Sequence, residues 1–235
     1  MVRSFSSYIG YGASASNNTV LVSGTGSVWN NRYDLYVGYN GSSNQLTIQS
    51  GGVVSNSAGY NRLTIQSGGV VNNYTGFIGY DPSASNNAVL VSGTDSVWNN
   101  NGILYVGDFG SSNQLTIQSG GVVNNTHGYI GYDPGASNNA VLVSGTGSAW
   151  NNSSNLHVGF SGSSNQLTIQ SGSVVSNTTG YIGYYASASN NAVLVSGNGS
   201  VWDNSFSLYV GSYGSFNALT IQSGGVVRSF SSYIG

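Results

Sequence analysis

Cysteine, lysine and glutamate are absent from this 235-residue chain, and its only charged residues are four arginines and six aspartates. Without cysteine, the chain can have neither a disulfide framework nor a thiolate metal site. With a net charge of −2, the chain lacks the excess of basic residues that is typical of nucleic-acid-binding proteins. No apolar run approaches the roughly 20 residues that span a bilayer. We therefore expect no nucleic-acid partner and no membrane insertion in this segment.

Polarity comes instead from glycine, serine, asparagine and threonine, whereas a globular domain usually has about a quarter of its residues charged. This composition does not indicate a disordered chain, because the apolar residues recur regularly along it. The first residues, 1–5, lack the apolar region of a signal peptide. We therefore expect either a protein that stays inside the cell or an internal piece of a longer exported chain.

One asparagine column gives the register of an internal repeat. Its members are 26 residues apart except for a single spacing of 17, and Val or Ile stands four residues after each of them. The column is Asn18, Asn44, Asn61, Asn87, Asn113, Asn139, Asn165, Asn191 and Asn217.

A second asparagine column marks another turn of the repeat. Asparagine tolerates left-handed backbone conformations, and amides stacked one rung apart can hydrogen-bond along the column. We therefore interpret both columns as structural ladders of turns, with simple turn formation as the alternative. The second column is Asn31, Asn56, Asn73, Asn100, Asn125, Asn152, Asn177 and Asn204, with Ser229 in the ninth place.

The segments between these turns alternate apolar and polar residues with the period of two typical of half-buried strands. Leu46 and Ile48 are expected to point inward, and Thr47 and Gln49 outward. Three short strands and three turns in about 26 residues form one coil of a parallel β-helix, in which stacking provides the core. The predicted fold is all-β: a single-domain β-solenoid over residues 1–235, with about nine rungs.

The 17-residue rung has only Ser-Ala-Gly-Tyr between Asn56 and Asn61. It lacks the aromatic-Ile-Gly segment of the other rungs, so we expect it to lose one side of the coil.

The octapeptide RSFSSYIG occupies residues 3–10 and again 228–235. The shift of 225 residues equals eight rungs of 26 and one of 17, so the chain is one superperiod with a restart at residue 228. Uncapped solenoid ends are sheet edges that invite pairing. We therefore predict head-to-tail self-association or a longer parent chain.

A column of aromatic residues is the best candidate for a contact surface. By alternation these side chains point outward, with an interruption at the short rung. Three interpretations remain open: a stack that only stabilises the fold, lateral packing against a neighbouring rod, and contact with glycans. The column is Tyr8, Tyr36, Phe77, Tyr105, Tyr129, His157, Tyr181, Tyr209 and Tyr233.

Tryptophan recurs in alternate rungs, and valine stands at the same place in the other rungs. Because a core would respond to that difference in volume, we expect a corner or surface position. The residues are Trp29, Trp98, Trp150 and Trp202, alternating with Val54, Val123 and Val175.

Residues with catalytic potential are scattered. Glycoside cleavage needs a pair of carboxylates in different environments, whereas Asp81 and Asp133 stand before prolines and are typical of turns. His127 has no second ligand in register for a metal. We expect no catalytic residue, no metal and no cofactor, and thus no enzyme.

The segments LYVGYNGSSNQLTIQSGGVV (35–54) and VLVSGTGSVWNN (20–31) resemble repeats of bacterial autotransporter (type V secretion) passengers and of PEP-CTERM-associated proteins. The resemblance covers essentially the whole chain. It implies a right-handed β-helix in a secreted, extracellular or cell-surface protein, often a large adhesin.

Two functions follow as expectations. The first is a structural fibre, stalk or adhesin shaft that associates with itself, head-to-tail and also laterally. The alternative is an adhesin module that binds a glycan or host receptor through the outward tyrosine column.

Overall fold

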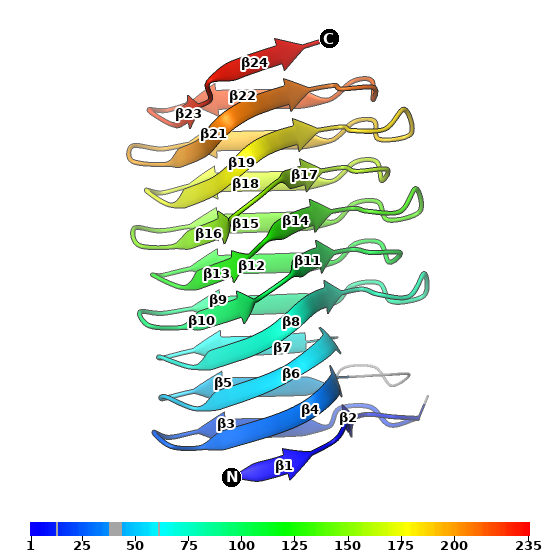
Figure 1. Cartoon of the computed structure of the whole chain (residues 1–235), viewed down its shortest axis with the longest axis vertical. Helices are drawn as coiled ribbons and strands as arrows, with labels where there is room; N and C mark the ends of the chain where they lie inside the picture. Colours follow the sequence, from blue (N-terminus) through cyan, green and yellow to red (C-terminus); the bar gives the residue numbers. More distant parts are fainter. Residues whose placement is uncertain (13, 38–43, 61) are drawn as a thin grey trace.

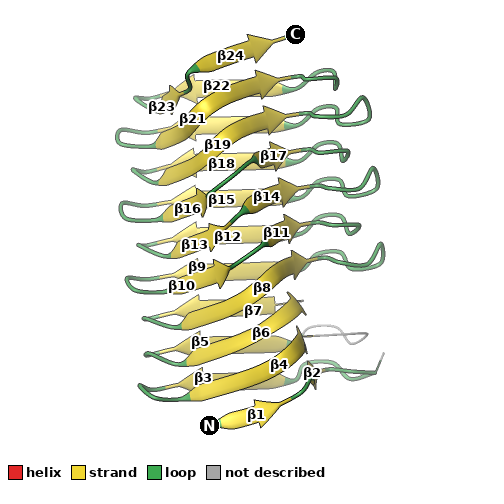
Figure 2. Cartoon of the chain, viewed as in Figure 1, coloured by secondary structure: helices red, strands yellow, loops and turns green. Residues whose placement is uncertain are grey.

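The computed structural model describes residues 1–12, 14–37, 44–60 and 62–235. In these ranges the chain forms 24 strands and no helix, and consecutive coils stack into a solenoid (Figure 1). All strand pairings are parallel, as in Leu115 with Val141 and Tyr105 with Tyr129. The predicted parallel β-solenoid is therefore confirmed. Two sheets enclose the core, and turns connect them at both sides (Figure 2).

Sheet B, the nine-stranded sheet, has one strand in each rung, so its outermost strands are eight full turns apart. Its strands are β3 (Thr19–Ser23), β5 (Gln45–Gln49), β7 (Arg62–Gln66), β9 (Ala88–Ser92), β12 (Gln114–Gln118), β15 (Ala140–Ser144), β18 (Gln166–Gln170), β20 (Ala192–Ser196) and β22 (Ala218–Gln222).

Sheet A has fifteen strands. They are β1 (Val2–Ser4), β2 (Ser7–Ile9), β4 (Val28–Val37), β6 (Val53–Tyr60), β8 (Val70–Ile78), β10 (Val97–Asn100), β11 (Ile103–Val106), β13 (Val122–Asn125), β14 (His127–Ile130), β16 (Ala149–Asn152), β17 (Leu156–Val158), β19 (Val174–Ile182), β21 (Val201–Val210), β23 (Val226–Arg228) and β24 (Ser231–Ile234).

The third turn expected in each rung is only a bend within sheet A. The second and third segments of a rung run on as one strand in β4, β6, β8, β19 and β21. Where β19 pairs with β21, the register shifts between Asn177 and Thr179. A β-bulge of this kind bends a strand without moving it to another sheet.

The prediction that the short rung loses one side is wrong. In β6, Ala58 pairs with Leu35 of β4 below and Gly76 of β8 above, so this side of the coil is complete. The missing part is the loop that follows: one residue separates β6 from β7, whereas nine separate β8 from β9. Such loops leave β8, β11, β14, β17, β19 and β21 at their arrowheads (Figure 1).

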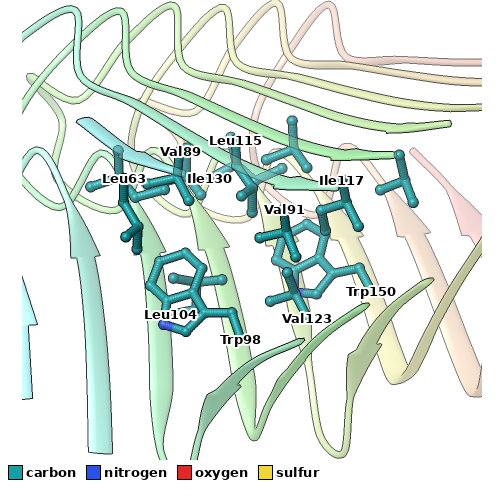
Figure 3. Packing of buried hydrophobic residues seen from close by; sticks show 14 of the residues in the cluster. Leu63, Val89, Val91, Trp98, Leu104, Leu115, Ile117, Val123, Ile130 and Trp150 are labelled. Atoms are coloured by element: carbon teal, nitrogen blue, oxygen red, sulfur yellow. The ribbon is translucent and has the colours of Figure 1, made fainter. Parts of the chain in front are cut away.

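The core follows the predicted alternation. In β12, Leu115 and Ile117 are fully buried, and similar pairs from every interior rung stack above one another (Figure 3). Each such side chain contributes roughly 1.5–3 kcal/mol when it is fully buried. One rung alone could not enclose these residues, so the stability of the solenoid depends on contacts between rungs.

Three of the four tryptophans lie in the core and Trp29, in the first rung, is partly buried against it, which corrects the prediction of a corner or surface. Trp98, Trp150 and Trp202 have no exposed surface. Space for each ring comes from a glycine in the preceding rung: a Cβ on Gly128 would lie 2.8 Å from Cζ2 of Trp150. From β8 onward, rungs with Val and Gly thus alternate with rungs that have Trp and Leu, so this packing repeats every two rungs.

Candidate functional site: aromatic files and amide ladders

The aromatic column runs along sheet A, because parallel pairing aligns its members from rung to rung. Tyr105 of β11, for example, pairs with Phe77 of β8 and with Tyr129 of β14. In the short rung the place is taken by Gly59, so the column is interrupted there as predicted. The side chain of Tyr36 lies outside the described residues.

From Phe77 to Tyr233 the rings form one continuous stack, which we call the inner file. Neighbouring ring centroids are 4.6–5.3 Å apart and the rings lie within 14° of parallel. Offset-stacked rings of this kind stabilise each other beyond the area that they bury. Because each ring covers its neighbours' faces, the inner file presents mainly ring edges to solvent.

A second set of rings, the outer file, was not predicted. Tyr132, Phe160 and Tyr184 stack on each other at 4.9–5.2 Å. They meet the rings of the inner file edge-on at 82–89°. The signal in the sequence was an aromatic residue directly after the glycine that follows most strands of the inner file, as in Ile-Gly-Tyr. Exposed rings at the rim of this file are Tyr80, Tyr185 and Tyr213.

His157 is a buried member of the inner file, only 4% exposed. It stacks between Tyr129 and Tyr181. Burial, and secondarily the nearby His127, lower the pKa of His157 to about 3. The imidazole is therefore neutral at physiological pH and packs as an aromatic ring, which agrees with its place in the predicted aromatic column.

Asp108 interrupts the outer file. It follows Gly107 in the way that Tyr132 follows Gly131, and the residue is only 6% exposed. Burial, and to a smaller extent Asp133, raise the pKa of Asp108 to about 6. At neutral pH the fold therefore holds a desolvated carboxylate.

Replacing Asp108 with Asn is expected to stabilise the protein at pH 7.5 by about 1–3 kcal/mol. The pKa is higher in the folded state, so the penalty develops as pH rises through the range from about 4 to 6 and is complete above it. Denaturant unfolding at pH 4.5 and 7.5 measures this. The stability that Asp108→Asn gains over the wild type should therefore be smaller at pH 4.5 than at pH 7.5.

Asp81→Asn is the matched control. Ser83 donates its backbone N–H and its hydroxyl to Oδ1 of Asp81, and these bonds lower the pKa of this exposed carboxyl. Asp81→Asn should therefore not stabilise the protein. A gain equal to that of Asp108→Asn would contradict the assignment of a buried-charge penalty.

Asp81 and Asp133 both act within their own turns, as their sequence context predicted. Oδ1 of Asp133 accepts a hydrogen bond from the backbone N–H of Gly135 at 3.0 Å. In the described part of the chain, no group of three or more His, Asp or Glu side chains is placed to hold a metal ion.

The first asparagine column hydrogen-bonds along the stack. Oδ1 of Asn139 accepts bonds from both the backbone N–H and Nδ2 of Asn113, at 2.8 and 3.1 Å. The same pair of bonds recurs at every step from Asn87 to Asn217, and between Asn18 and Asn44. Asn61 lies outside the described residues. These amides fix the loops on the rungs and leave little donor capacity for a ligand.

The second column is built differently, as units of two rungs. Nδ2 of Asn125 donates to Oδ1 of Asn152 at 2.6 Å, and the indole N–H of Trp150 donates to Oδ1 of Asn125 at 2.6 Å. The units around Trp98 and Trp202 repeat this arrangement. The side chain of Asn56 lies outside the described residues. Here the asparagines serve as partners of the buried tryptophans.

No family of known proteins matches the sequence, and no curated protein does. A comparison of structures finds a fragment of TibA hyperglycosylated by TibC, with 16% identity and a TM-score of 0.24 over 99% of this chain and all of that one. A TM-score of this size does not establish a shared fold. The resemblance to autotransporter and PEP-CTERM-associated repeats therefore stays a prediction. In the described ranges, no helix is long and apolar enough to cross a membrane.

Proposed function

We propose that this chain is a structural, surface-exposed module, a shaft or fibre segment outside the cell, and that it is not an enzyme. The observation that carries the proposal is the use of its polar residues. The amides of the first column, the indole N–H groups of three buried tryptophans and two turn aspartates bond to the fold itself. The repeat therefore supports elongation instead of one local site.

We further propose that copies associate head-to-tail. Sheet A has an open edge at both ends, β1 with β2 at one end and β23 with β24 at the other. Direct stacking of these edges would leave sheet B one strand short, because its terminal strands β22 and β3 would be two rungs apart. A joint without this gap requires that one copy give up its first sheet A strands.

The repeated octapeptide provides such a joint. Residues 228–235 of one copy can occupy the place of residues 3–10 of the next, because the two segments are identical. Ile9 pairs with Val37 and is only 5% exposed, whereas its equivalent Ile234 is 85% exposed. In the joint, Ile234 would acquire the burial that Ile9 has now, and the solenoid would continue without a missing strand.

Ile234→Asp should abolish head-to-tail filaments at little cost to the single copy, since a change at an exposed position usually costs below about 0.5 kcal/mol. Negative-stain electron microscopy over a concentration series measures filament length. Filaments of the wild-type protein should lengthen as its concentration rises. Ile234→Asp should form no filaments, although its melting temperature should equal that of the wild type. Filaments that persist in Ile234→Asp would contradict this joint.

The second candidate function is a glycan- or receptor-binding adhesin module, and the exposed rings of Tyr80, Tyr185 and Tyr213 favour it. The inner file is the weaker surface for sugar stacking, because its ring faces are covered. A glycan array with the wild type and with Tyr185→Ala tests this function. Binding that the substitution removes would support it, and the absence of any bound glycan would count against it.

A further inference from the structure

The outward face of sheet B is a regular surface that no other element of the described chain covers. It lies behind sheet A in Figure 1 and has one strand in each rung. Five-residue strands point three side chains outward, and across nine strands the only charged one is Arg62. Leu21 at one end of this face is 59% exposed.

The face is corrugated with a period of two rungs. From β9 to β20, strands with outward Ala, Leu and Ser alternate with strands with outward Gln, Thr and Gln. Each of the three columns thus alternates a long side chain with a short one. In a Gln-Thr-Gln strand the two flanking side chains are long and the central one is short. In an Ala-Leu-Ser strand the central side chain is long and the two flanking ones are short.

Such a surface is complementary to itself after a shift of one rung. A two-fold axis parallel to the strands, between β12 and β15, places β12 of one copy opposite β15 of the other. Gln114 then faces Ala140, Thr116 faces Leu142, and Gln118 faces Ser144. The same match continues outward to β9 with β18 and to β7 with β20, so Arg62 faces Ala192 and not a second arginine.

We propose that two copies of this chain pack sheet B against sheet B in this antiparallel register, forming a dry, interdigitated interface. Interdigitation of small polar and apolar side chains between paired sheets needs no charge. Eight of the nine strands overlap, and only β3 projects beyond the partner. At about 3.3 Å per residue and 4.8 Å per strand, the contact covers about 600 Å² of each copy.

The total of about 1,200 Å² is at the lower limit for stable protein–protein interfaces. This argues for a reversible dimer that depends on concentration. The proposal deepens the lateral association expected above, and it uses a different surface from the head-to-tail joint. Ile234→Asp should leave the sheet B dimer intact, so the two proposals can fail separately.

Sedimentation equilibrium of Ile234→Asp protein, with and without a second substitution, tests the face. Leu142→Glu places a charge opposite Thr116 near the two-fold axis and should weaken dimerisation at least 100-fold. Leu21→Glu is the matched control: it lies in the same column, but on β3 outside the overlap, and should dimerise normally. A monomer in all three proteins, or a dimer that Leu142→Glu leaves unchanged, would overturn the proposal.

Spin labels test the register, since the chain has no cysteine of its own. A label on Thr116→Cys should lie about one rung from its copy in the partner, giving strong dipolar broadening. A label on Thr220→Cys should lie about seven rungs away, roughly 34 Å along the rod. Equal separations at the two positions would show parallel rods and would overturn the antiparallel arrangement.

Discussion

Gly131→Ala is expected to destabilise the solenoid by about 2–5 kcal/mol. Gly131 has a φ of +75°, and a Cβ there would lie 2.1 Å from Nδ2 of Asn165 and 2.5 Å from the carbonyl oxygen of Ala136. The left-handed conformation alone costs a residue with a Cβ about 1–2 kcal/mol, and overpacking adds about 1–3 kcal/mol. Denaturant unfolding followed by circular dichroism measures the loss.

Gly147→Ala separates these two contributions. Gly147 has a φ of +82°, but a Cβ there would make only an ordinary contact, 3.6 Å from Cα of Gly120. This control should cost only the conformational part, about 1–2 kcal/mol. Equal losses of stability in the two variants would contradict the close contact between Gly131 and the amide of Asn165.

Trp150→Val is expected to cost at least about 3 kcal/mol, although valine occupies the equivalent place in alternate rungs. The indole is fully buried, lies over Gly128 and donates to Oδ1 of Asn125. Valine would leave a cavity above Gly128 and remove the hydrogen bond of Asn125. The free energy of unfolding from denaturant titration gives the size of the effect.

Tyr74→Val provides the comparison, because Tyr74 is an aromatic residue that is largely exposed. Its replacement should change stability by no more than about 0.5 kcal/mol. A neutral Trp150→Val would support the surface position that the sequence alone predicted, and would contradict the packing over Gly128.

The fold was predictable because each residue of a stacked repeat meets its own equivalent. A column such as Asn113 and Asn139 has one spacing and one environment, so a regular pattern in the sequence becomes a regular contact in space. Inward and outward faces followed from the period of two, as Leu115 and Ile117 demonstrate.

The errors arose where a position depends on a different column. Nothing in the tryptophan column itself shows that Gly128 makes room for Trp150, because the two residues are distant within their rungs. The short rung has Gly59 where others have an aromatic ring, which concealed the strand and shifted the apparent deletion from the loop to the sheet. The outer aromatic file lies in loops whose residues vary among Tyr, Phe, Asp and Ser.

Sedimentation velocity of the wild-type chain from about 1 to 100 µM tests most directly whether this module is built to contact its own copies. We predict that the weight-average sedimentation coefficient rises continuously with concentration, starting from that of the 24.2 kDa single chain. A single 24.2 kDa species over the whole range would contradict the proposal that the solenoid associates with itself.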